Sequence, residues 1–334
     1  MSPDRSTAPS IAAAAEGNAA AMPGTEPTGP EHLIEFSAMA SRCSIRLAGV
    51  EPALARAWAD QAIAEVRRIE AKYSRYRADS VVSRLNAAAG QPGGIEVDDE
   101  TAGLIGFAAA LHRASDGLFD ITSGVLRRAW DFRSARLPDR ADVQALLPLV
   151  GWQRVEWDGV SLRLPRAGME LDFGGFGKEY AADRAASLLQ SLGATSGIVN
   201  LGGDLRVLGP QPDGQPWRIG IAHPRRLGEV IASLPLTEGA LATSGDYERY
   251  LVVDGRRYCH LLDPRSGWPV SHWQSVSVSA PACLAAGAIS SIAMLMEAKA
   301  ADFLRQQGAT WMAVDADGRL QCSDALEAAP AATE

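Results

Sequence analysis

The sequence has few cysteines and no excess of basic residues, and each shortage excludes a class of protein. Its four cysteines, Cys43, Cys259, Cys283 and Cys322, form no C-x-x-C pair and have no zinc-type spacing with the five histidines. Isolated thiols are typical of a reducing compartment rather than of a disulfide framework. Because the formal net charge is −8, broad attraction to nucleic acid or anionic lipid is unfavourable. We therefore expect no nucleic-acid partner.

Long apolar runs and targeting signals are also missing. Residues 1–30 are rich in Ala, Pro, Gly, Ser and Thr and lack the features of a signal peptide or a lipobox. No stretch approaches the roughly 20 apolar residues that span a bilayer. We expect no stable membrane insertion and a cytoplasmic location for the chain as given, or a periplasmic one if the start codon is mis-assigned. The sequence predicts disordered tails at 1–30 and 326–334 around one folded domain, 31–325.

The pattern of apolar residues predicts an α+β fold with largely antiparallel sheets packed with helices. Alternation over 34–47 predicts a single first strand. Helical spacing predicts helices at about 52–76, 80–88, 102–114, 179–192 and 285–297. Strands are predicted at 155–157, 162–164, 198–201, 205–208, 217–222, 230–234, 250–253, 258–262, 276–279, 312–314 and 319–322.

A glycine-rich turn, LDFGGFGKEY at 171–180, joins a strand-like segment to a helix. Glycines let a backbone approach a ligand closely, and a helix N-terminus presents unpaired N–H groups to an anion. Lys178 adds a positive charge there. An ordinary strand-to-helix turn would also explain the pattern, which matches neither a P-loop nor a Rossmann fingerprint.

Further polar turns follow in the second half of the chain. They are NLGGD at 200–204, TSGDY at 243–247 and HLLDPRSG at 260–267. A histidine can act as a base near neutral pH, and a nearby aspartate can orient it or bind a metal. A lone histidine is more often structural, and an Asp-Pro turn is a common turn. The number of such turns in one half of the chain favours a functional site.

Taken in order with SRY at 74–76, Asn86 and GLFDIT at 117–122, these turns resemble the ApbE family of FAD:protein FMN transferases. The resemblance runs from about Met39 to Met296. It implies a magnesium-dependent reaction in which FAD is cleaved at its pyrophosphate and AMP leaves. FMN is then joined by a phosphoester to a Ser or Thr of an acceptor flavoprotein. Charge neutralisation by a metal and N–H donors suits such a displacement.

The resemblance also assigns residues. Those implied to line the FAD site are Met39, Tyr76, Leu118, Phe119, Asp120, Asp172, Lys178 and Leu262. Tyr76 is the candidate for stacking on a flavin or adenine ring. His260 is the candidate base or acid for the acceptor hydroxyl, with Asp246 and Asp263 organising the site. The implied metal ligands are the carbonyl of Gly175 and two residues of the late helix.

The late helix departs from the family pattern, which has an aspartate followed four residues later by a threonine. This chain has Gly287 and Ser291 at those positions, so the hydroxyl is kept and the carboxylate is lost. Glu179 stands one helical turn after Gly175, and its carboxylate could reach a metal held there. Alternatively, Glu179 only interacts favourably with the helix dipole.

Three functions stay open at this point. The first is FMN transfer from FAD to a protein. The second is hydrolysis of FAD to FMN and AMP, which needs the same pyrophosphate site. The third is FAD binding without catalysis, which the loss of the carboxylate at Gly287 favours and the retained Lys178 and His260 oppose.

Overall fold

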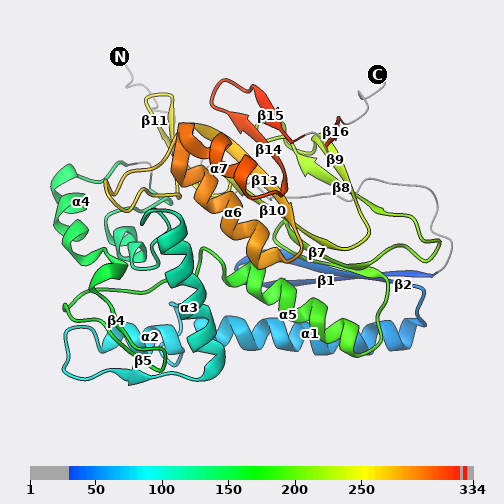
Figure 1. Cartoon of the computed structure of the whole chain (residues 1–334), viewed down its shortest axis with the longest axis horizontal. Helices are drawn as coiled ribbons and strands as arrows, with labels where there is room; N and C mark the ends of the chain where they lie inside the picture. The colour runs from blue at the N-terminus through cyan, green and yellow to red at the C-terminus, as the bar shows by residue number, and fades with distance from the viewer. Residues whose placement is uncertain (1–29, 135, 324–325, 329–334) are drawn as a thin grey trace, which may run out of the picture.

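The structure, a computed structural model, describes residues 30–134, 136–323 and 326–328 (Figure 1). The predicted N-terminal tail, except Pro30, lies outside the described residues. An α+β fold with antiparallel sheets is confirmed, because every named strand pairs antiparallel with its neighbours.

An eight-stranded sheet forms the centre of the molecule, in the order β1-β2-β6-β7-β10-β13-β14-β15. Its strands are β1 Glu31–Ala38, β2 Ser41–Ala48, β6 Gly197–Leu201, β7 Asp204–Gly209, β10 Gly239–Gly245, β13 Trp273–Ala280, β14 Thr310–Asp315 and β15 Leu320–Cys322. Alternate residues along a strand face opposite sides of the sheet. In β6, Val199 and Leu201 accordingly join the core on one face, and Ile198 joins a second core on the other.

Helices cover the first face of this sheet. The principal ones are α1 Pro52–Tyr73, α5 Gly177–Ser191 and α6 Cys283–Met296 (Figure 1). Apolar residues such as Val66, Ile69, Ala185 and Leu189 are fully buried between them and the sheet. The start of α5 and one side of α6 are thereby brought against each other, which positions the site described below.

A second sheet covers the other face. It has the order β16-β9-β8, with β8 Trp217–Ala222, β9 Val230–Leu236 and β16 Glu327–Ala328. Trp217, Ile219 and Leu234 of this sheet pack on Leu205 and Val207 of β7. Residues 327–328 of the expected C-terminal tail therefore form a strand, because they complete the edge of β9; residues 329–334 lie outside the described part of the chain.

Of the remaining elements, α2, α3, α4, β4 and β5 lie at the left of Figure 1, and α7 lies beside α6. The bounds of these elements are α2 Val81–Ala87, α3 Asp99–Ala114, α4 Arg140–Leu146, α7 Ala300–Gln306, the sheet of β3 Ile95–Glu96, β5 Ser161–Arg163 and β4 Glu156–Trp157, and the hairpin of β11 Tyr250–Val253 and β12 Arg256–Cys259. Ser80 caps α2 through its side chain, which accepts a hydrogen bond from the Ser83 N–H at 3.0 Å.

The prediction of one strand over 34–47 is wrong. The chain forms the β1–β2 hairpin instead, turning at Met39 and Ala40 with φ values of 53° and 56°. Such left-handed turns usually carry Gly or Asn, and neither residue is present at these two positions to signal a turn. Periodicity also did not predict α4, α7 or β10, the last because GALATSG has only one large apolar residue, Leu241.

One helical run, Cys283–Gln306, has the length and hydropathy of a membrane span, although the sequence suggested none. It is not one continuous helix, because Glu297 adopts a φ of 50° between α6 and α7. More than half of its most apolar window, 56%, is buried inside the protein. Packing of α6 on β10 and β13 accounts for its apolar composition.

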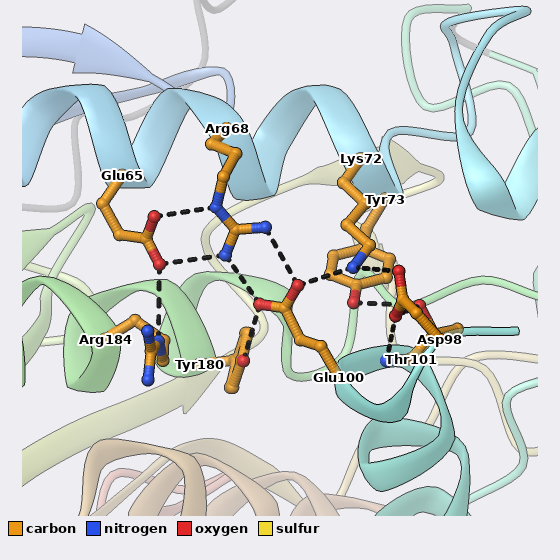
Figure 2. Close-up of polar contacts among 9 residues, drawn as sticks. All are labelled: Glu65, Arg68, Lys72, Tyr73, Asp98, Glu100, Thr101, Tyr180 and Arg184. Atoms are coloured by element: carbon orange, nitrogen blue, oxygen red, sulfur yellow. Dashed lines mark hydrogen bonds and ion pairs between the residues drawn. The ribbon is translucent and has the colours of Figure 1, made fainter.

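A network of ion pairs fixes α5 against α1 and α3 (Figure 2). Glu100, at the start of α3, accepts hydrogen bonds from Arg68 at 2.7 and 2.9 Å and from Lys72 at 2.6 Å, both in α1. It also accepts one from the hydroxyl of Tyr180 in α5 at 2.8 Å. These partners, led by Arg68, hold the pKa of the Glu100 carboxyl well below its usual range. Tyr180, next to Glu179, is thereby held in place.

Candidate functional site

The glycine-rich turn lies at the N-terminus of α5 and contacts the aromatic core. Gly174 and Gly175 are exposed, Phe176 is fully buried, and the helix begins at Gly177. A Cβ atom on Gly175 would lie 3.3 Å from Cζ of Phe119, so the glycine lets the turn pack closely on that ring. The first N–H groups of a helix have no partner inside the helix. The N–H groups of Gly174, Phe176 and Gly177 already donate to Asp172 and to the Phe173 carbonyl. The other N–H groups of the turn, at Gly175 and Lys178, are donors of the kind that bind phosphates.

Lys178 joins this turn to the second polar turn. Its Nζ lies 2.9 Å from Oδ2 of Asp204, which is buried. The attraction of Asp204 raises the pKa of Lys178 above its usual range, so the side chain is cationic at all ordinary pH values. A Cβ atom on Gly202 would lie 3.7 Å from the same Nζ. The polar turns at 171–180 and 200–204 are therefore neighbours in space.

Glu179 is buried against α6, with only 7% of the residue exposed. A Cβ atom added to Gly287 would lie 2.6 Å from Cγ and 2.8 Å from Oε1 of Glu179. Its other oxygen, Oε2, is buried and has no hydrogen-bond partner among the described residues. Burial raises the pKa of Glu179, because the carboxylate loses hydration. The Glu179 side chain thus occupies the space that Gly287 leaves empty.

Serine hydroxyls lie along the same helix. Oγ of Ser244, in the third polar turn, lies 2.8 Å from Oγ of Ser290 and 3.0 Å from Oγ of Ser291. Ser290 also donates to the carbonyl of Gly287 at 3.0 Å. Gly287 and Ser291 are four residues apart and share one face of α6. Ser291 therefore lies one helical turn from Gly287, the residue that the Glu179 side chain packs against.

These residues fit a hard divalent cation. Nowhere in residues 30–134, 136–323 and 326–328 do three His, Cys, Asp or Glu side chains gather as a metal cluster. A cation here would therefore depend on one carboxylate together with hydroxyl and carbonyl oxygens, which are ligands that magnesium accepts. The unpartnered Oε2 of Glu179 is the observation that favours such an occupant.

His260 follows β12, and its Nδ1 lies 3.3 Å from the carbonyl oxygen of Arg249. Burial, and then the charges of Arg249 and Lys178, lower the pKa of His260 to about 4. The imidazole is therefore neutral near pH 7 and can accept a proton.

Each predicted companion of His260 has an arginine partner. Asp246 accepts two hydrogen bonds of 2.6 Å from Arg225, and Asp263 accepts bonds of 3.0 and 2.9 Å from Arg265. Asp263 also accepts the Arg265 N–H at 2.8 Å, as an Asp-Pro turn does. These carboxylates organise the loops on either side of His260. A role for either of them in catalysis stays a prediction.

The apolar residues predicted to line a flavin site differ in exposure. Leu118 and Phe119 are buried, and Met39 is half-buried in the left-handed β1–β2 turn, with its N–H bonded to Oε1 of Glu70 at 2.7 Å. Tyr76 is 77% exposed, which leaves its ring free to stack on a ligand.

Asp172 is tied to the loop that carries Tyr76. Its carboxylate forms an ion pair with Arg75 and accepts the N–H of Gly174 at 2.9 Å. Arg75 in turn donates to the Tyr76 hydroxyl at 2.9 Å. The loop after α1 is therefore connected to the glycine turn, although nearly a hundred residues separate them.

Asp120 and Leu262 have structural partners. Asp120 accepts hydrogen bonds from Thr122 at 2.8 and 2.6 Å and from the Trp152 N–H at 2.9 Å. Leu262 is half-buried and packs on the cluster of Val125, Leu126 and Val150. Their contact with a ligand stays a prediction.

A pocket of about 570 Å³ brings two of the predicted motifs together. Gly117 and Asp120 line it from one motif, and Pro264 and Arg265 line it from another. Its other lining residues are His112, Arg113, Asp116, Leu147, Val150, Gly151, Gln153 and Arg154. The motifs at 117–122 and 260–267 therefore line the same pocket.

Sequence reasoning missed the arginine partners of the predicted acids. Arg75 lies inside the SRY motif at 74–76, so the motif already pointed to a basic residue beside Tyr76. Arg225 lies 21 residues before Asp246 in an exposed loop, and nothing in the sequence links the two.

The fold and site define an α+β protein with a glycine-rich turn at the N-terminus of a helix, of the kind that can bind phosphate. A lysine and a buried carboxylate follow the turn, and a neighbouring helix carries serine hydroxyls. A sequence profile of the ApbE family matches residues 39–323. The chain belongs to the ApbE family.

Two sequence relatives are named FAD:protein FMN transferase. The protein from Haemophilus influenzae is 29% identical over 242 residues, which cover 67% of this chain and 68% of that protein. A protein from Klebsiella pneumoniae is 36% identical over 212 residues, which cover 62% of this chain and 65% of that protein.

Solved structures are similar over most of their length. The ApbE protein from Thermotoga maritima has a TM-score of 0.80 and 33% identity, covering 88% of this chain and 97% of that one. The flavinyl transferase ApbE from Pseudomonas stutzeri, in its apo form, has a TM-score of 0.77 and 31% identity, covering 89% and 96%.

Proposed function

We propose that this chain is an FAD:protein FMN transferase that uses Mg²⁺ and modifies a Ser or Thr of an acceptor flavoprotein. The names of its relatives support the transfer reaction. The observation that supports it in this chain is that the Glu179 side chain, one helical turn after Gly175, fills the space at Gly287, one helical turn before Ser291. The compartment and the identity of the acceptor stay predictions.

In the reaction, the acceptor oxygen attacks the phosphorus on the FMN side of the FAD pyrophosphate. A phosphoester bond to FMN forms, the bond to the AMP oxygen breaks, and AMP leaves with the electron pair. The proton of the acceptor hydroxyl goes to a base. No net redox change occurs, so the flavin ring needs only to be held.

His260 is our candidate for that base. In the tautomer that carries hydrogen on Nδ1, this nitrogen donates to the Arg249 carbonyl at 3.3 Å. Nε2 then has a free lone pair for the acceptor proton. Because the pKa of His260 is about 4, the ring is ready to accept without first losing a proton.

Lys178 and the N–H groups of the glycine turn would hold the pyrophosphate, and Tyr76 would stack on a ring of FAD. The Gly175 carbonyl, the Glu179 carboxylate and the Ser291 hydroxyl would hold Mg²⁺. When bound, Mg²⁺ would neutralise charge that develops on the phosphate oxygens.

The test combines the full-length protein, FAD, MgCl₂ and candidate acceptor domains, followed by flavin fluorescence on a denaturing gel. Transfer predicts a fluorescent acceptor band that disappears when the acceptor Ser or Thr is replaced by Ala, or when EDTA is added. Free FMN and AMP without a labelled band would instead indicate an FAD pyrophosphatase. Intact FAD throughout would indicate a non-catalytic FAD-binding protein.

A further inference from the structure

Glu179 and Gly287 are a sterically matched pair. The Cγ, Oε1 and Cδ atoms of Glu179 lie 2.6, 2.8 and 3.0 Å from the point where a Cβ at position 287 would be. Real Cβ atoms are not found that close to other atoms, so any larger residue at 287 must displace the glutamate. Gly287 is itself buried within α6, where glycine costs roughly 0.5–1 kcal/mol relative to alanine. The glycine makes room for the Glu179 side chain, which gives a structural reason for this residue in the helix.

The space is filled by a carboxylate that has one unpartnered oxygen. Oε2 of Glu179 accepts no hydrogen bond from the described residues, and the residue is 93% buried, the complement of its 7% exposure. The neighbouring Lys178 does not bond to it, and its Nζ instead lies 2.9 Å from Oδ2 of Asp204. An ionised carboxylate taken out of water is stable only when it is paired or bound to a metal.

The surroundings of this carboxylate supply neutral oxygens. Ser291 lies one helical turn from Gly287 on the same face, and its Oγ is 3.0 Å from Oγ of Ser244. The carbonyl of Gly287 accepts from Ser290 at 3.0 Å, so that group is already engaged. One carboxylate beside hydroxyls is a donor set for a hard divalent cation.

We propose that Glu179 supplies the sole carboxylate ligand of a divalent cation from α5, and that Gly287 is the vacancy in α6 that admits it. This inference rests on the proposed function for the role of the cation. A side chain at position 287 would point at the place where the Glu179 carboxylate lies. The same cation could therefore be served by a carboxylate from either helix, but not by both at once.

The test measures Mn²⁺ binding by electron paramagnetic resonance of the free ion, with the full-length protein and with FAD either present or absent. Wild type should bind one Mn²⁺ that excess Mg²⁺ displaces. Glu179→Gln, which keeps the shape and removes the charge, should weaken this binding at least about tenfold. Gly287→Ala, which blocks the space without touching the carboxylate, should weaken it as well.

The decisive variant moves the carboxylate. Glu179→Ala removes all three atoms that meet position 287, so Glu179→Ala combined with Gly287→Asp should bind Mn²⁺ more tightly than Glu179→Ala alone. The matched control is Glu238→Gln, which removes an exposed acid between β9 and β10 and should leave binding unchanged. Urea unfolding of each variant confirms that it is folded.

Unchanged Mn²⁺ affinity in folded Glu179→Gln would overturn the inference, as would a Glu179→Ala/Gly287→Asp variant that binds no better than Glu179→Ala. Absence of any Mn²⁺ binding to wild type with FAD would overturn it too. Failure of the proposed function is distinguishable, because wild type would then bind Mn²⁺ and FAD without labelling an acceptor.

Discussion

The Asp183 carboxylate of α5 accepts a hydrogen bond from the backbone N–H of Cys283 at 2.8 Å. It accepts a second, also of 2.8 Å, from the N–H of Leu284, and so caps α6 from outside that helix. Glu179 and Asp183 are four residues apart on α5 and face α6 together. The cap therefore fixes how α6 presents Gly287 and Ser291 to the site.

Loss of this cap should weaken both stability and activity. Asp183→Ala leaves the first N–H groups of α6 unpaired, and we expect about 0.5–2 kcal/mol lower free energy of unfolding in urea. Asp183→Asn keeps an acceptor oxygen and should lose less. Asp98→Ala is the control, because Asp98 caps the N-terminus of its own helix, α3, with its Oδ1 accepting from the Thr101 N–H at 2.9 Å. If FMN transfer fell equally in both variants, the cap would have no specific link to the site.

Glu100 should make stability depend on pH. Its pKa is lowered in the folded protein from an ordinary 4.5, so its contribution is full above pH 4.5 and is lost as pH falls below that value. We expect Glu100→Gln to lower the free energy of unfolding by about 1–3 kcal/mol at pH 7. The difference from wild type should shrink steadily as urea unfolding is repeated from pH 4.5 downward. A difference that stayed constant over this range would contradict the assigned ion pairs.

Tyr76 should affect ligand binding without affecting stability. Because its side chain is largely exposed, Tyr76→Ala should change the free energy of unfolding by less than about 0.5 kcal/mol. Loss of a stacked ring should nevertheless weaken FAD binding by about tenfold in a fluorescence titration. Tyr76→Phe keeps the ring and should bind nearly as wild type. The control is Val160→Ala, another exposed apolar residue, in the β4–β5 turn, which should leave FAD affinity unchanged.

His260 should be needed for FMN transfer, and its protonation should not lower the transfer rate at mildly acid pH. We expect His260→Asn to lower the transfer rate by at least about a hundredfold while FAD affinity is kept. The lowered pKa of about 4 means that the folded protein holds the ring neutral, whereas the unfolded chain protonates it near 6.5. Stability from this group is therefore full above pH 6.5 and is lost as pH falls through about 4.

Two measurements check this assignment. The pH profile of transfer should show no loss of activity at pH 6.5 attributable to His260, and His32→Gln serves as a control histidine on β1. An acid limb near 6.5 that vanished in His260→Asn would refute the lowered pKa. Unchanged transfer by His260→Asn would remove His260 from the mechanism.

The sequence determined the class of fold, the family and most helices and strands. Amphipathic spacing was enough for α1 and α5, because a helix that packs on a sheet needs one apolar face. It failed at Met39 and Ala40, where the chain turns without a glycine, and at β10, whose small residues carry no period. Strand pairing there depends on neighbours distant in the chain, which local patterns do not encode.

The ordered motifs also predicted which residues belong to the site, but not their partners. Asp246 pairs with Arg225 and Asp172 with Arg75, and each pair joins segments that only the folded chain brings together. The sequence showed a glycine where a carboxylate was expected and a glutamate elsewhere. Only the tertiary structure decided that the Glu179 side chain fills the space at Gly287, because that depends on how α5 packs against α6.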